Sequence, residues 1–114
     1  AAGIGYVHTN ALLQAHPKME KAQLDMKQAA QKAQQQFQKQ SAGKSDAEKQ
    51  QLANNLQREL AQKERDEMTP IMSDIMKAIQ QVRKEKNLDV VLESGAVVDG
   101  GVDVTSDVAA KLGK

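Results

Sequence analysis

Two stripes of apolar residues, one on each side of a short turn, constrain the fold of this chain most strongly. In both stripes the apolar residues recur at intervals of three and four, which is the spacing of one face of an α-helix. The first stripe consists of Met19, Ala22, Met26, Ala29, Ala30, Ala33 and Phe37. The second stripe consists of Leu52, Leu56, Leu60, Met68, Met72, Ile75, Ile79 and Val82. This pattern predicts two long amphipathic helices.

The segment between the stripes predicts a reversal of the chain. Ser41, Ala42 and Gly43 are typical turn residues. Ser45, followed three residues later by Glu48, has the pattern of a capping box, in which each residue satisfies a backbone N–H of the other. The first helix therefore ends near the turn, and the second begins just after it.

The two helices are expected to pack against each other as an antiparallel hairpin over residues 18–70. Pairing the stripes about the turn places large side chains opposite small ones, which allows close packing. The expected partners are Leu52 with Ala33, Leu56 with Ala29 or Ala30, and Leu60 with Met26. At ~1.5 Å per residue, the segment from Pro17 to Gln40 reaches ~36 Å. A hairpin of that length forms a projecting arm.

Two prolines, Pro17 and Pro70, fall at the same height in this pairing. Pro70 lies inside the second stripe, so it should kink the helix or restart it with Thr69 as the cap. We expect the two prolines to mark a hinge at the base of the arm, although a static kink would give the same pattern.

The remaining segments, residues 1–17 and 71–114, predict a small β-rich body with flanking helices. Ile4, Tyr6 and Val7 form a short strand candidate near the start of the chain. Seven of the nine valines lie between residues 90 and 108, where strand propensity is concentrated. The predicted strands there are 89–93 and 96–98, joined around Ser94 and Gly95, followed by 102–104 and a final helix. The expected fold class is α+β.

Composition indicates that this body cannot close a core by itself. The chain is 39% hydrophobic, but 16 of these residues are alanines, and Tyr6 and Phe37 are the only aromatic residues. Small sheets with so few large side chains are marginally stable alone. We expect the chain to complete its core with copies of itself.

No motif for catalysis or cofactor binding is present, and we expect neither an enzyme nor a cofactor. Cysteine is absent, the two histidines are His8 and His16, and Gly3 and Gly5 precede a strand and not a phosphate-binding helix. The net charge of +1 divides into +4 over residues 18–86 and −3 over residues 87–114. A nucleic-acid partner is not expected, because such proteins are more basic and use aromatic stacking.

Two other features leave alternatives open. Small residues at Ala1, Ala2 and Gly3 fit a mature N-terminus left by signal-peptide cleavage, although a trimmed chain would look the same. The spread lysines of the hairpin either keep it hydrated or form a cationic surface for an acidic or lipid-like partner.

The whole chain resembles the Skp (OmpH-like) family of periplasmic chaperones. The resemblance rests on Ile4-Gly5-Tyr6-Val7 before Leu12-Leu13, and on the hairpin rich in Lys, Gln and Ala. Its most specific part is the continuous run from Val82 to Val98, closed by Val102-Asp103-Val104-Thr105. The sequence departs from the family pattern at His8, where Asp is frequent, and its arm is shorter and less basic than in well-known members.

This resemblance implies a homotrimer in which strands of three chains form one small β-barrel body and the hairpins project as tentacles around a cavity. It implies an ATP-independent holdase that encloses unfolded outer-membrane proteins in the periplasm, with lipopolysaccharide or an anionic membrane surface as a further partner. The client-binding residues are expected to be Met19, Lys27, Lys32, Phe37, Lys39, Lys44 and Lys49. The trimer body is expected to contain Ile4, Tyr6, Val90, Val91, Leu92, Val97 and Val98.

Methionine is soft enough to suit many clients, so Met72 and Met76 are further candidates, whereas Met26 and Met68 are expected in the seam between the helices. The alternative function is a structural coiled-coil adaptor whose arm recognises one folded partner.

Overall fold

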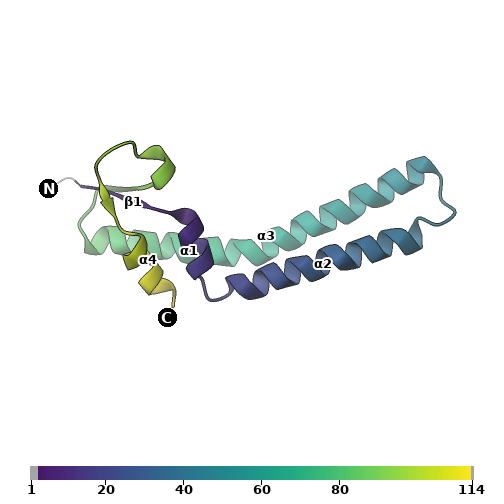
Figure 1. Ribbon diagram of the computed structural model, residues 1–114, viewed down its shortest axis with the longest axis horizontal. Coiled ribbons are helices and arrows are strands. Elements are labelled where there is room, and N and C mark those ends of the chain that lie inside the picture. Colours follow the sequence, from purple (N-terminus) through teal and green to yellow (C-terminus); the bar gives the residue numbers. More distant parts are fainter. Residues whose placement is uncertain (1–2, 114) are drawn as a thin grey trace. The chain divides into compact units, whose positions relative to one another are not determined.

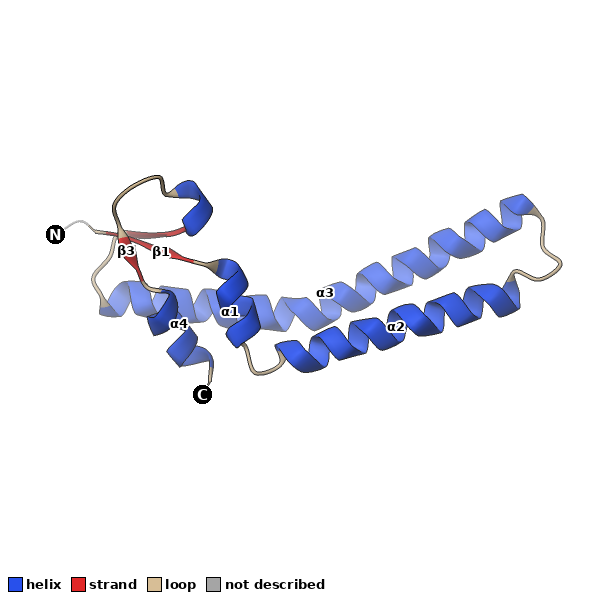
Figure 2. Ribbon diagram, in the orientation of Figure 1, coloured by secondary structure: helices blue, strands red, loops and turns tan. Residues whose placement is uncertain are grey.

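The computed structural model describes residues 3–113 of the 114-residue chain. Ala1 and Ala2, where a processed N-terminus is expected, lie outside the described residues. The elements in chain order are β1 (Ile4–Val7), α1 (Thr9–Ala15), α2 (Met19–Gln40), α3 (Asp46–Glu85), β2 (Val90–Glu93), the 3-10 turn η1 (Ser94–Ala96), β3 (Val102–Asp103) and α4 (Thr105–Leu112) (Figures 1 and 2). The predicted α+β class, with a long helical hairpin and a small β body, is confirmed.

The chain divides into two compact units. One, here the sheet unit, contains the residues up to Glu20 and those from Pro70 onward; the other, the hairpin unit, is Lys21–Thr69. Helix α3 runs through the division between Thr69 and Pro70.

In the hairpin unit, α2 and the first part of α3 run side by side in opposite directions (Figure 1). Gly43 takes the left-handed conformation in the turn between them, with φ of 74°, which a residue without a Cβ adopts at little cost. The predicted capping box is confirmed. The Ser45 N–H donates to Oε1 of Glu48 at 3.0 Å, and the Glu48 N–H donates to Oγ of Ser45 at 3.2 Å.

The seam of the hairpin is narrow. Leu56 is buried, whereas Met26, Ala29, Ala33, Leu60 and Met68 are half-buried. Most other positions of the two helices are exposed. The hairpin therefore owes its stability to one line of apolar contacts and to good helix-forming residues, as its sequence pattern predicts.

The sheet unit contains a three-stranded parallel sheet in the order β2-β1-β3. Gly5 pairs with Val91 and Tyr6 pairs with Leu92, so β1 is the central strand. A Cβ on Gly5 would lie 2.8 Å from Cδ1 of Leu88 and 3.5 Å from Cγ2 of Val104. The absence of a side chain at residue 5 therefore lets Leu88 approach the central strand closely.

One face of the sheet is covered by helices. Side chains alternate between faces along a strand, so Val7 lies on the same face as Gly5. Most of the core of the sheet unit comes from β1, from helices α1, α3 and α4 and from the residue after β3: Val7, Leu12, Ile71, Ile75, Val82, Val104, Val108 and Leu112. Burial of each large side chain in this core is worth about 1.5–3 kcal/mol.

Helix α3 ends in a Schellman motif. Asn87 takes the left-handed conformation with φ of 57°. The Leu88 N–H donates to the Arg83 carbonyl at 3.0 Å, and the Asn87 N–H donates to the Lys84 carbonyl at 3.2 Å. These bonds satisfy the last carbonyls of the helix and turn the chain toward β2.

Two predictions about local structure are wrong. Residues 96–98 are not a strand: η1 occupies Ser94–Ala96, and Val98 is fully exposed, with a relative exposure of 103%. The reason is that β2 pairs in parallel with β1 instead of folding back on the next segment, so residues 96–98 have no strand beside them.

The predicted restart of the helix at Pro70, with Thr69 as the cap, is also wrong, because α3 continues through Pro70. Proline removes one backbone donor. The segment after it buries Ile71, Ile75 and Val82, and this burial offsets the cost of the missing bond.

Candidate functional site

The expected client-binding lysines are all on the surface of the hairpin unit. Lys27, Lys32 and Lys39 lie on α2, Lys44 lies in the turn and Lys49 lies on α3. All five are exposed, and within residues 3–113 no acidic side chain lies within ion-pair distance of them. These lysines form a cationic surface on the hairpin.

The ion pairs of the hairpin unit lie nearer to its open end. Lys21 donates to Oδ2 of Asp25 at 2.8 Å, and Nζ of Lys63 lies 3.5 Å from Oε1 of Glu67. The hydrogen bond from Lys21 holds the pKa of Asp25 below its ordinary value, and the positive charge of Lys63 acts in the same direction. The pKa of Lys21 is raised by the same bond. Charges from both helices therefore stabilise this end of the seam.

A hollow of about 340 Å³ lies between the two helices of the hairpin unit. Leu56 and Ala29, which the sequence pairs, both line it, together with the side chains of Lys32, Glu59 and Lys63. Alanines on α2 leave this space because they do not fill the gap opposite the leucines of α3. The hollow is an apolar strip with charged side chains in its lining.

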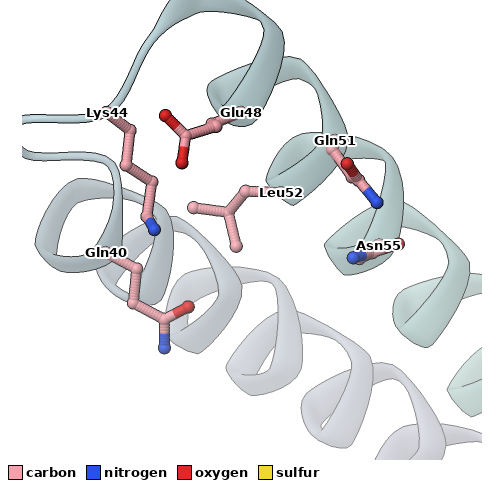
Figure 3. A pocket seen from close by; sticks show the side chains of 6 residues that line it. All are labelled: Gln40, Lys44, Glu48, Gln51, Leu52 and Asn55. Atoms are coloured by element: carbon pink, nitrogen blue, oxygen red, sulfur yellow. The ribbon is translucent and has the colours of Figure 1, made fainter.

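A second hollow, of about 530 Å³, lies close to the turn of the hairpin. Its lining residues are Gln40, Lys44, Glu48, Gln51, Leu52 and Asn55. Figure 3 shows Leu52 between the side chains of Gln40 and Lys44 and those of Gln51 and Asn55. Polar groups that can donate and accept hydrogen bonds therefore surround one leucine.

The apolar residues considered as client contacts differ in their exposure to solvent. Met19 is only 5% exposed, so its assignment as a client contact is wrong: the first residue of α2 is part of the packing of the sheet unit. Phe37 is half-buried. Met72 and Met76 are accessible, with exposures of 42% and 54%, because each lies one position after a buried residue of α3 (Ile71 or Ile75) and is turned away from the buried face.

The expected trimer residues lie on both faces of the sheet and in the loop after it. Ile4 and Val90 are paired and are 48% and 38% exposed, whereas Tyr6 and Leu92 are paired and half-buried. By alternation, these four side chains lie on the face opposite the helices. We call them the outer sheet face.

The other expected trimer residues are not on that face. Val91 pairs with Gly5 and lies toward the helices. Val97 and Val98 lie after η1, the first half-buried and the second fully exposed.

A polar cluster at the carboxyl ends of the strands was not found from the sequence. Asp103 accepts hydrogen bonds from the hydroxyl and the N–H of Thr105 at 2.6 and 2.9 Å, and its Oδ2 lies 3.5 Å from Nε2 of His8. The donors of Thr105 hold the pKa of Asp103 below its ordinary value. The Thr9 hydroxyl donates to Glu93 in the same region. These contacts join the ends of β1, β2 and β3.

His8, which stands where the family frequently has Asp, therefore has a structural role. Its ring stacks edge-on against Tyr6, with centroids 5.9 Å apart, and its N–H donates to the Thr105 hydroxyl at 3.0 Å. The sequence offered no pattern for these partners, because His8 and Thr105 are 97 residues apart.

Other classes of site have little support in the part of the chain that the structure covers. Among residues 3–113, no group of three His, Cys, Asp or Glu side chains could hold a metal ion. None of the helices in the same range is long and apolar enough to cross a membrane.

The expected hinge residues occupy different local structures. Pro17 is exposed in the turn between α1 and α2, and Pro70 is exposed within α3. The hinge itself stays a prediction.

Comparison with protein families places most of the chain in a known family model. A protein-family model described as "Outer membrane protein (OmpH-like)" matches residues 40–112, which include α3, the strands β2 and β3 and the whole of α4. No curated protein matches the chain.

Proposed function

The chain belongs to the OmpH-like family, and from this membership we propose that it is an ATP-independent holdase chaperone of the periplasm. Its clients would be unfolded outer-membrane proteins, which it keeps from aggregating. The family match over residues 40–112 is the observation that carries the proposal, because it spans half of the hairpin and most of the sheet unit.

The surface chemistry of the hairpin supports this proposal. A holdase needs weak and reversible contacts with many sequences, and adaptable or spread contacts suit that task better than one deep pocket. The hairpin offers a shallow apolar strip beside Leu56, the polar hollow around Leu52 and five exposed lysines without ion-pair partners in the described range. Client chains with acidic stretches would be attracted to this cationic surface, most strongly at low salt.

We also propose that three copies assemble through the sheet units. The outer sheet face exposes Ile4 and Val90, and β2 and β3 are edge strands with unpaired backbone groups. Exposed edges and apolar faces favour association with other strands. A trimer would cover the strand edges and the outer sheet face. The cavity between three hairpins would hold the client.

The experiment is an aggregation assay with an unfolded outer-membrane β-barrel protein diluted from urea, without nucleotide. The intact chain should suppress light scattering. A shortened variant lacks residues 25–61, with Leu24 joined to Gln62 through a copy of the native turn, residues 41–45. It should lose this protection while circular dichroism and mass show that the sheet unit still folds and assembles. Full protection by the shortened variant would contradict the role of the hairpin.

A lysine variant tests the cationic surface separately. Replacing the five lysines of the hairpin surface by glutamine should slow client capture at low salt and remove most of the salt dependence. The control replaces Lys84 and Lys86, two exposed lysines of the sheet unit, by glutamine. If both variants behave alike, the hairpin lysines have no special part in capture.

The same assay separates the holdase from a coiled-coil adaptor. An adaptor would bind one folded partner. It would show no preference for unfolded chains over their folded forms. Protection of several unrelated unfolded β-barrels, with no binding to their folded forms, is expected for the holdase.

A further inference from the structure

His16 lies in an unusual environment at the junction between α1 and α2. It is the C-cap residue of α1, and it is 5% exposed, the one buried polar residue within the described range 3–113. Its ring makes two hydrogen bonds. Nε2 lies 2.8 Å from Oδ2 of Asp74 on α3, and Nδ1 lies 3.0 Å from the backbone nitrogen of Lys18.

The two bonds define the protonation state of the ring. The backbone N–H of Lys18 can only donate, so Nδ1 must offer a lone pair and carries no proton. The single ring proton is therefore on Nε2, where it is donated to the Asp74 carboxylate. The geometry accommodates the neutral imidazole in one tautomer, and it excludes a second ring proton on Nδ1.

Charged side chains of both signs lie near the ring of His16. Lys77 on α3 and Lys18 in the turn carry positive charges that act on the Asp74 carboxylate. Lys111 of α4 lines a shallow hollow together with Asp74 and Lys77, and Glu20 is the first acidic residue of α2. The hydrogen bond from His16 holds the pKa of Asp74 below its ordinary value, with Lys18 and Lys77 acting in the same direction. Asp74 thus stays charged as the acceptor throughout the range in which histidines titrate.

The turn between α1 and α2 is short, and few other hydrogen bonds hold it. The His16 carbonyl accepts the N–H of Met19 at 3.1 Å, and the His16 N–H donates to the Leu13 carbonyl at 3.3 Å. Pro17 has no N–H to contribute. The side-chain bond from Nδ1 to Lys18 is therefore a main support of the turn before α2.

We propose that His16 is a pH-sensitive latch, closed when neutral and opened by protonation of Nδ1, that fixes the turn between α1 and α2 to α3. A solvent proton added to Nδ1 converts the acceptor into a donor, so two N–H groups then face each other and the bond to Lys18 breaks. The bond to Asp74 remains and becomes an ion pair. The start of α2 is thus held firmly at higher pH and loosely at lower pH.

The test uses NMR on the intact chain labelled with ¹⁵N. At pH 7.5 the ring nitrogens of His16 should report a proton on Nε2 and none on Nδ1. When the pH is lowered until the ring signals report a proton on Nδ1, the hydrogen-exchange protection factor of the Lys18 amide should drop about fivefold to tenfold, the effect of losing one ordinary hydrogen bond. The amide of Ala78, in the middle of the buried face of α3, should keep its protection.

Two variants separate the latch from a general effect of acid. His16→Asn keeps an acceptor near the position of Nδ1 but does not titrate, so Lys18 protection should become independent of pH. His8→Asn changes the other histidine and should leave the pH response intact. A proton on Nδ1 at pH 7.5, or a Lys18 protection factor that does not change when Nδ1 gains a proton, would overturn the proposal.

Discussion

Tyr6 and Leu92 lie side by side in the parallel register of β1 and β2, on the face of the sheet opposite the buried Val7. Their neighbours Ile4 and Val90 on the same face are exposed. A sheet with helices on only one face thus presents an apolar surface next to two open strand edges. This relationship is the structural basis of the proposed trimer.

Leu92→Glu should reduce assembly because it places a charge on the outer sheet face. A leucine buried at an interface contributes about 1.5–3 kcal/mol, and each of three copies would lose this contribution. Mass measured by light scattering should fall toward that of the single chain. Leu24→Glu is the matched control, since Leu24 is an exposed leucine of the hairpin unit. An equal loss of mass in both variants, or in neither, contradicts the assignment.

Asn87→Gly should stabilise the sheet unit by roughly 0.5–1 kcal/mol. Asn87 has φ of 57°, a conformation that costs glycine almost nothing and other residues more. Asn87→Ala should destabilise the unit for the same reason. Urea denaturation monitored by circular dichroism gives both values, and a glycine variant less stable than the native chain would be inconsistent with the Schellman motif.

Acid should weaken the capping box of α3. The N–H of Ser45 donates to Glu48 and holds the pKa of that carboxyl below its ordinary value, with the Ser45 hydroxyl as a smaller cause. A lowered pKa means that the contribution to folding is complete above the ordinary glutamate value near 4.5 and is lost as the pH falls through the lower folded value.

NMR titration of the Glu48 side-chain carboxyl carbon measures this shift directly. Ser45→Ala should move the pKa of Glu48 part of the way back toward its ordinary value, because the backbone N–H remains. A pKa in the native chain equal to that of a model peptide, or one that Ser45→Ala does not alter, would rule out the capping role.

Pro70→Ala should narrow the distribution of distances between the hairpin unit and the sheet unit if Pro70 belongs to a hinge. Alanine restores a backbone donor inside α3 and stiffens the helix. The chain contains no cysteine, so cysteines at Gln38 and Ser106, both exposed, can carry a pair of spin labels. A narrow distribution that the substitution leaves unchanged would indicate a static helix.

The hairpin was predictable because its information is local. Helical spacing, the turn at Gly43 and the box of Ser45 and Glu48 are all written in neighbouring residues. The same reasoning misplaced Met19, since a stripe shows which face is apolar but not whether a second layer covers it. Of the two alternatives expected at Pro70, the restart of the helix was wrong, because burial of Ile71 and Ile75 outweighs a local preference.

The sheet was predictable in part. Its strand segments 4–7, 90–93 and 102–103 were close to those expected, but their parallel order depends on contacts between residues far apart in the chain. The bond between His16 and Asp74 joins residues 58 positions apart and had no sequence pattern at all. Composition, with too few large residues for a closed core, predicted only that copies of the chain complete the core, and this stays a prediction.

The most direct test is the mass of the native chain in solution, measured by light scattering before and after addition of an unfolded outer-membrane β-barrel protein. We expect three times the chain mass of 12.4 kDa before addition, and a larger complex that stays in solution afterwards. A species of 12.4 kDa that leaves the client to precipitate would contradict both the assembly through the outer sheet face and the proposed holdase function.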